Sequence, residues 1–84
     1  MGLAVKCVAW LEGQVSEGKA QLESDEIVFR GEFKITVPFH SIRHLSASEG
    51  KLSILLNAGT LVLDLGVSAS KWENKIRNPK SLLD

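Results

Sequence analysis

Two histidines and one cysteine are the residues of this 84-residue chain whose chemistry could serve a metal ion or a nucleophilic reaction. His40 and His44 are four positions apart, the spacing that aligns two imidazoles on one face of a helix. The residues between them have the pattern of a strand or turn and include no glutamate that could act as a general base. Two imidazoles lack the third and fourth ligands that zinc prefers, although Cys7 could lie near them in space. We therefore expect no metal and no cofactor, and the alternative hypothesis is a small-molecule or metal-binding domain that uses the His40/His44 region.

Cys7 is the residue closest in kind to a nucleophile, and its position argues against that role. It shares the parity of Val5 and Ala9, so in a strand it faces inward as a small hydrophobic side chain. A nucleophilic cysteine needs exposure and a lowered pKa, and on a strand Lys6 points to the opposite side. We expect Cys7 to be structural.

The acidic residues have no pattern that predicts catalysis. Glu23, Asp25 and Glu26 fall in one turn, and Asp64 stands alone between leucines on the solvent-facing parity of its strand. Paired catalytic carboxylates need a shared pocket, for which a domain of this size has little room. Because the sequence also lacks a glycine-rich phosphate loop and a nucleophile elbow, we expect a protein that is not an enzyme.

The overall charge limits the partners. Ten Lys and Arg residues balance ten Asp and Glu residues, whereas a sequence-independent grip on nucleic-acid phosphates needs a basic excess. The basic cluster that the sequence does contain consists of Lys71, Lys75, Arg77 and Lys80. It lies on or just after a predicted helix, whose dipole favours cations at its C-terminus. With one cysteine and no export signal or membrane span at its start, the chain is predicted to be cytoplasmic, without nucleic-acid partners or membrane insertion.

Short apolar runs with a period of two predict antiparallel strands from about residue 3 to residue 65. The inward-facing residues of the first run are Leu3, Val5, Cys7, Ala9 and Leu11. Gly31 is expected to take a positive φ in a tight hairpin, and Pro38 to end its strand because it has no amide hydrogen. The run from residue 42 to residue 48 changes parity once, which predicts a bulge between Ile42 and Leu45.

After residue 66 the period becomes helical, which predicts one helix over about residues 68–78. The side chains at helical spacing, expected to plug the core, are Ala69, Trp72 and Ile76. Ser70 and Glu73 fit a capping box at the start, with Ser68 as a competing N-cap. Pro79 disfavours helical geometry at Asn78, which predicts the end of the helix.

Seven short strands followed by an amphipathic helix with an inward-facing tryptophan resemble pleckstrin-homology-like domains. Within residues 18–77, a Leu-x-x-x-x-Ile-Val-Phe strand pair, a Val-Pro-Phe-x-x-Ile element and a Leu-rich hairpin resemble the related GRAM-type pattern. The chain also resembles a family of uncharacterised bacterial proteins that share the segments FRG and KWxxKIRNPKSLLD, in which the chain continues beyond this point. The resemblance implies a mainly β fold with one C-terminal α-helix: a bent antiparallel sheet or partly open barrel capped by the helix. It also implies a single domain over residues 1–84, which could be the N-terminal domain of a longer protein.

The chain departs from the lipid-binding members of the family it resembles, and the resemblance then implies an interaction module. Phosphoinositide-binding members carry several Lys and Arg residues in the loop after the first strand, whereas residues 12–18 here read EGQVSEG, which would repel a polyphosphate. The main hypothesis is a non-enzymatic protein-protein interaction or assembly module. Val8 and Trp10 lie on the face of the first strand opposite the core. They could contact another copy of the chain in a homo-oligomer or a following domain, or be covered by Leu82 and Leu83.

Overall fold

The computed structural model describes residues 3–77, which form seven strands, one 3-10 helix and one α-helix. The strands are β1 (Leu3–Leu11), β2 (Gln14–Leu22), β3 (Glu26–Arg30), β4 (Lys34–Pro38), β5 (His44–Ser48), β6 (Lys51–Leu56) and β7 (Gly59–Asp64). The 3-10 helix η1 covers Phe39–Ser41, and the helix α1 covers Ser68–Arg77. The predicted mainly β fold with a C-terminal helix is confirmed. Asn78, Lys80, Leu82 and Leu83, on which other predictions fall, lie outside the described residues.

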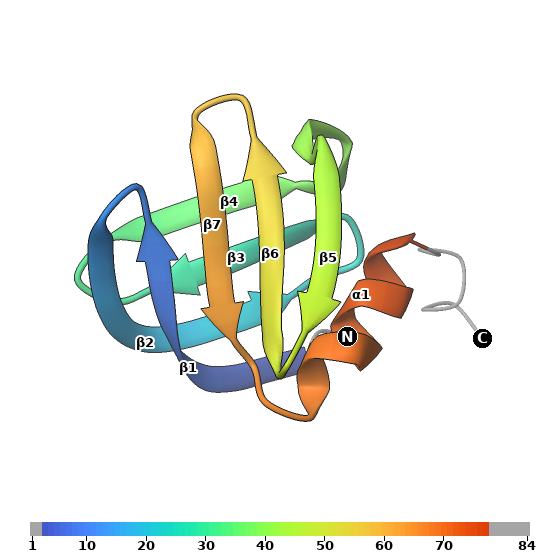
Figure 1. The fold of residues 1–84 in the computed structure, drawn as a ribbon, viewed down its shortest axis with the longest axis horizontal. Helices are drawn as coiled ribbons and strands as arrows, with labels where there is room; N and C mark the ends of the chain where they lie inside the picture. Colours follow the sequence, from blue (N-terminus) through green and yellow to red (C-terminus); the bar gives the residue numbers. More distant parts are fainter. Residues whose placement is uncertain (1–2, 78–84) are drawn as a thin grey trace.

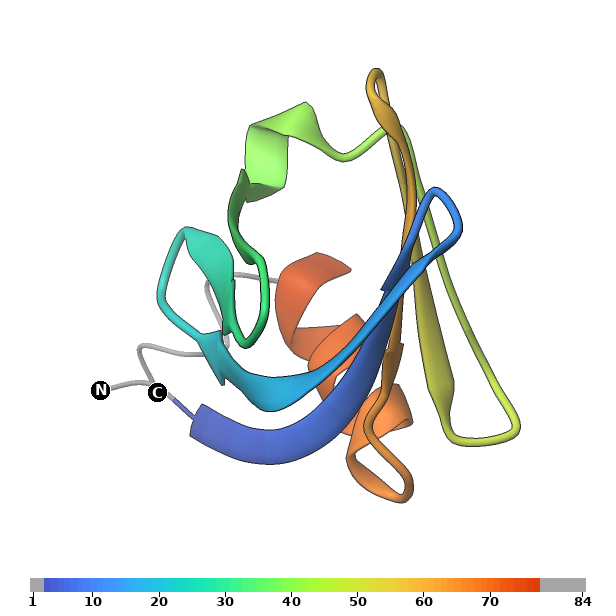
Figure 2. The ribbon, with the colours of Figure 1, turned by 90° about the vertical axis from the view of Figure 1, so that its left-hand side faces the viewer.

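All seven strands form one antiparallel sheet in the order β4-β3-β2-β1-β7-β6-β5. β1 pairs with β2 along its whole length, but it pairs with β7 only over Ala9–Leu11, because the sheet bends along β1 and β2. The bend folds the sheet into a half-barrel. Figure 1 shows β5, β6 and β7 crossing in front of β2, β3 and β4, and Figure 2 shows the curl from the side. Within residues 3–77 the edge strands β4 and β5 do not pair with each other, so the barrel is partly open.

Helix α1 closes one end of the half-barrel by packing against β5 and β6. Its apolar stripe buries Ala69, Trp72 and Ile76 against core residues from the strands, and Trp72 is only 1% exposed. At its C-terminus, Arg77 Nη2 donates to the carbonyl oxygen of Leu45 on the edge strand β5. The helix therefore covers an edge that would otherwise present unpaired backbone groups. No helix within residues 3–77 has the length and apolarity needed to cross a bilayer.

The turn at Gly31 differs from the prediction. Positive φ values among residues 3–77 occur at Glu12, Gly13, Glu49, Gly50, Gly59 and Gly66, and not at Gly31. Glycine is needed there for a different reason, because a Cβ atom on Gly31 would lie 2.4 Å from Ser16 Oγ and 2.6 Å from the carbonyl oxygen of Glu17. The turn between β3 and β4 therefore packs directly on the backbone of β2, at a distance that only glycine permits.

The predicted bulge between Ile42 and Leu45 lies at the start of β5, where the N–H of Arg43 donates a 2.8 Å hydrogen bond to the carbonyl oxygen of Leu55, the residue that His44 faces, so that two successive residues oppose one. Residues 39–41 form η1, and β5 then pairs with β6 without interruption over its five residues. The change of parity in the sequence coincides with this bulge.

The predicted capping box of α1 is wrong. The helix begins at Ser68, so Ser70 lies inside its first turn. The carboxylate of Glu73 instead accepts a hydrogen bond of 3.2 Å from Arg77, one turn further along. This pair stabilises the exposed face of the helix by a few tenths of a kcal/mol, about 0.3–0.5 for such a spacing.

Candidate interaction surface

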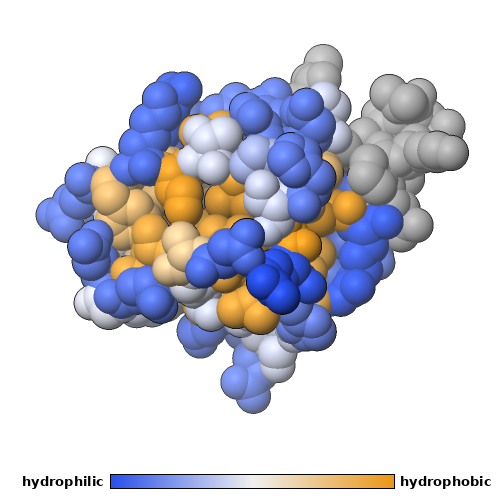
Figure 3. Space-filling view, turned by 90° about the horizontal axis from the view of Figure 1, so that it is seen from above, coloured by the Kyte–Doolittle hydropathy of each residue, from blue (hydrophilic) through white to orange (hydrophobic). Residues whose placement is uncertain are grey.

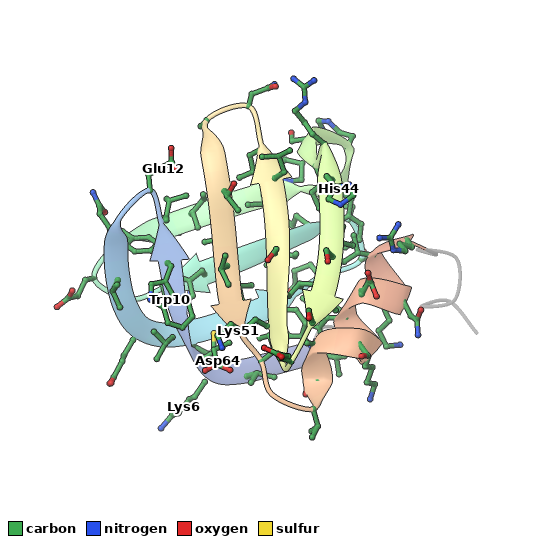
Figure 4. The ribbon with its side chains drawn as sticks, viewed as in Figure 1. Lys6, Trp10, Glu12, His44, Lys51 and Asp64 are labelled. Atoms are coloured by element: carbon green, nitrogen blue, oxygen red, sulfur yellow. The ribbon has the colours of Figure 1, made fainter. Side chains whose placement is uncertain are left out.

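The outward face of β1 carries an apolar patch that continues onto both neighbouring strands. The register of the sheet places Val15 of β2 on one side of Trp10 and Val62 of β7 on the other. Val15 is 54% exposed, while Val8, Trp10 and Val62 are half-buried. Figure 4 shows Trp10 on the outer surface of the sheet, pointing away from the barrel interior. We call the set Val8, Trp10, Val15 and Val62 the outer patch.

Sequence reasoning identified two members of the outer patch and missed the other two. The sequence predicts a loop over residues 12–18, which includes Val15, yet β2 begins at Gln14 and the turn before it has only two residues, Glu12 and Gly13. Both take a positive φ, as a type I′ hairpin turn requires. The Glu-Gly dipeptide between two alternating runs was the signal that could have found this hairpin. No comparable signal exists for Val62, which lies beside Trp10 only through the pairing of β1 with β7.

A second apolar surface lies at the open end of the half-barrel. A groove of about 280 Å³ separates the edge strand β4 from the turn between β6 and β7. Its lining contains no charged side chain and consists of Ile35, Thr36, Val37, Pro38, Ser41, Leu56, Asn57 and Ala58. Figure 3 shows this end as an apolar band with a polar rim. The groove offers no cation that could neutralise a phosphate group.

The structure does not assemble a metal site from the histidines. His40 lies on η1 and His44 begins β5, and both are exposed. His44 projects from the outer surface of the sheet (Figure 4), whereas Cys7 packs against the core. Within residues 3–77, no three side chains among His, Cys, Asp and Glu come together as ligands would. The metal-binding form of the alternative hypothesis therefore lacks a ligand set in the part of the chain that the structure describes, whereas its small-molecule form keeps a pocket of about 250 Å³ beside His44.

The environment of Cys7 favours the protonated thiol. Cys7 is half-buried on the inner face of β1. Burial raises the pKa of the thiol, a hydrogen bond with the backbone of Ala20 lowers it, and the carboxylate of Asp64 raises it again. The net shift of the pKa is upward, which leaves less of the nucleophilic thiolate at neutral pH than in an exposed cysteine.

A seven-stranded half-barrel whose C-terminal helix closes one end defines a pleckstrin-homology-like fold. The solution structure of the N-terminal PH domain of human ARAP2 matches with a TM-score of 0.75 and 10% identity, covering 99% of this chain and 82% of that one. The crystal structure of the C-terminal domain of an unknown protein from Leishmania infantum matches with a TM-score of 0.71 and 10% identity, covering 92% and 80%. No protein-family profile and no curated protein matches the sequence. At this level of identity the likeness shows the fold alone.

Proposed function

We propose that this chain is a non-enzymatic protein interaction module of pleckstrin-homology-like fold, and that the outer patch is its docking surface. The observation that carries the proposal is the register that sets the exposed Val15 and the half-buried Val62 on either side of Trp10. An apolar group of this kind on an outward sheet face is typical of a protein contact. Tryptophan is also enriched among the residues that dominate binding energy at interfaces.

The proposal can be tested by photo-crosslinking in cells that express the chain. A photoreactive phenylalanine analogue replaces Val15 in the outer patch, and in the matched control it replaces Val67, which is 99% exposed and belongs to no strand. We expect discrete protein adducts from position 15 and none of the same mass from position 67. Adding Trp10→Ser should remove those adducts while the far-ultraviolet circular dichroism spectrum stays the same. Adducts that are identical from both positions, or that survive Trp10→Ser, would refute the proposal.

The same experiment separates self-association from binding of another protein. Adducts of twice the chain's mass that contain only this chain indicate a homo-oligomer. In that case sedimentation velocity of the native chain should show the oligomer, and Trp10→Ser should shift it to a monomer. Adducts that contain a second polypeptide indicate a different partner.

We also propose a GRAM-type affiliation with the bacterial proteins that share its segments, and a cytoplasmic location. The Leu-x-x-x-x-Ile-Val-Phe segment ends β2 and forms β3, and the Val-Pro-Phe segment joins β4 to η1, so both coincide with structural junctions. The single cysteine supports a reducing compartment. The uncharged lining of the groove at the open end supports a module that does not bind phosphoinositides.

A further inference from the structure

Four cationic side chains form one row across the outward face of β1, β2, β3 and β4. The register pairs Lys6 with Lys19, Lys19 with Arg30, and Arg30 with Lys34. All four residues are exposed, and each has the outward parity of its strand. Adjacent strands are about 4.8 Å apart, so this cationic row spans about 14 Å. Figure 4 shows its first member, Lys6, projecting from β1 into solvent.

No side chain of this row is held by a direct hydrogen bond or ion pair in the described part of the chain. The neighbouring row on one side is uncharged and consists of Ala4, Gln21, Val28 and Thr36. On the other side lie two exposed carboxylates, Glu17 and Glu32. Because like charges opposite one another on adjacent strands destabilise a sheet, the row weakens the fold that carries it, and a bound anion would relieve the repulsion.

The cationic row is continuous with the outer patch. An open groove of about 520 Å³ runs along the bend of β1 and β2, lined by Lys6, Cys7, Val8, Glu17, Gly18, Lys19 and Arg30. Val8 thus belongs both to this groove and to the outer patch. The same face therefore offers an apolar area and, next to it, a line of unpaired positive charges.

We infer that the cationic row binds a carboxylate-rich segment of the partner protein, with an apolar side chain of that segment resting on the outer patch. This inference rests on the proposed function and adds the chemistry of the partner. Carboxylates on three alternate residues of an extended segment span about 13 Å, which matches the length of the row. Charge complementarity of this kind fixes register and raises the rate of association. A nucleic acid fits less well, because the chain has no net basic charge to hold a run of phosphates.

The inference predicts that one substitution separates binding from stability. Lys19 stands between Lys6 and Arg30, so Lys19→Glu converts two repulsive cross-strand pairs into two attractive ones. The variant should melt at the same temperature as the native chain or higher, yet lose affinity for a carboxylate-rich segment. Lys71→Glu on the exposed face of α1 is the matched control, since it makes the same change in net charge away from the row.

The experiment is an NMR titration of the ¹⁵N-labelled chain with the peptide Ile-Glu-Ser-Glu-Ser-Glu and with its counterpart in which Gln replaces each Glu. We expect the amide signals that shift to cluster around residues 6, 19, 30 and 34, and only with the Glu peptide. Affinity should fall about tenfold in Lys19→Glu and about tenfold between low and high salt, since exposed charges are screened. Lys71→Glu should bind as the native chain does.

Several results would overturn the inference: equal shifts with both peptides, unchanged affinity in Lys19→Glu, or tighter binding of a single-stranded oligonucleotide or of phosphatidylserine bicelles at the same residues. Its failure is distinguishable from that of the proposed function. If the peptide does not bind but position 15 still gives specific adducts, the outer patch stands and the acidic partner does not. If the peptide binds but the adducts are absent, the row stands without the interaction surface proposed for the outer patch.

Discussion

The backbone N–H of Glu32 donates a 2.7 Å hydrogen bond to the side-chain oxygen of Ser16, sixteen residues earlier in the chain. Ser16 is only 2% exposed, and its hydroxyl in turn donates to the carbonyl oxygen of Glu17. The bond holds the turn between β3 and β4 against the first part of β2. It ties this turn to the strand whose pairing with β3, followed by that of β3 with β4, brings Arg30 and Lys34 into line with Lys19.

Removing the Ser16 hydroxyl should destabilise the domain. Ser16→Ala leaves the N–H of Glu32 without its acceptor in a partly buried site, and we expect a loss of about 1–3 kcal/mol in the free energy of unfolding. Ser53→Ala on the outward face of β6 is the control and should change that free energy by less than about 0.5 kcal/mol. Urea unfolding followed by circular dichroism measures both. Equal effects of the two substitutions would contradict the structural role of this bond.

Gly31→Ala should lower the free energy of unfolding by more than the backbone conformation of Gly31 alone suggests. The new Cβ would meet both Ser16 Oγ and the backbone oxygen of Glu17, and the backbone of β2 is held on both sides by its pairing with β1 and β3. We expect a loss of about 3 kcal/mol or more, at the upper end of overpacking effects. Gly66→Ala, with a φ of +61° and no atom within 4 Å of the new Cβ, should cost only the strain of that conformation, about 1–2 kcal/mol.

The Gly31 result can be checked by a double substitution. Ser16→Ala removes the contact with Ser16 Oγ but leaves the carbonyl oxygen of Glu17 at 2.6 Å and a ring carbon of Phe29 at 3.0 Å. Gly31→Ala should therefore remain strongly destabilising in the Ser16→Ala background. A double variant as stable as Ser16→Ala alone would show that the contact with the Ser16 side chain, and not the close backbone approach, requires glycine.

Trp72 should contribute more to stability than any other single side chain of α1. It is the largest buried side chain among the described residues, and Trp72→Ala is expected to cost about 3–5 kcal/mol, a large share of the stability of a small domain. Trp10→Ala makes the same substitution at a half-buried position on the outward face, and it serves as the control. Chemical denaturation of the two variants should give a midpoint far lower for Trp72→Ala. Similar midpoints would mean that α1 does not close the core.

The raised pKa of Cys7 predicts how stability depends on alkaline pH. The folded-state pKa lies above that of the unfolded chain because of burial and the Asp64 carboxylate, so the unfolded thiol ionises first. The contribution of the thiol to the free energy of unfolding is fully present below the pKa of the thiol in the unfolded chain, about 8.5. It is lost as the pH rises through the pKa of the thiol in the folded chain. The difference in unfolding free energy between the native chain and Cys7→Ala should be constant from pH 6 to 8. Above pH 8 the native chain should lose stability relative to Cys7→Ala. A constant difference up to pH 10.5 would contradict the shift.

The same electrostatic cause predicts the reactivity of the thiol. Asp64→Asn removes a negative charge that raises the pKa of Cys7, so the rate of modification by a disulfide reagent at pH 8 should increase. Asp25→Asn, on the turn between β2 and β3, is the control and should leave the rate unchanged. A rate that does not respond to Asp64→Asn would show that the Asp64 carboxylate does not raise the pKa of Cys7.

The elements of the fold could be predicted from sequence because their signals are local. Alternation of apolar residues placed the strands, and the spacing of Ala69, Trp72 and Ile76 placed the helix and its buried face. The predictions failed where the role of a residue depends on a contact with a distant part of the chain or on a turn too short to recognise. Gly31 suggested a tight turn, but the contact that requires glycine is with Ser16 and Glu17 on another strand. The 3-10 turn over Phe39–Ser41 was not predicted, since a single 3-10 turn leaves no period long enough to recognise.

The sequence alone determined which face of each strand is apolar and which is polar, because the side-chain period of a strand is two wherever the strand lies. It therefore predicted that Val8 and Trp10 face away from the core. Only the tertiary structure decided what lies beside them, because neighbours across a sheet are set by register, and a shift of one residue would exchange the two faces. The outer patch gained Val15 and Val62 in this way. The cationic row, whose four residues are scattered between positions 6 and 34, exists only once four strands align.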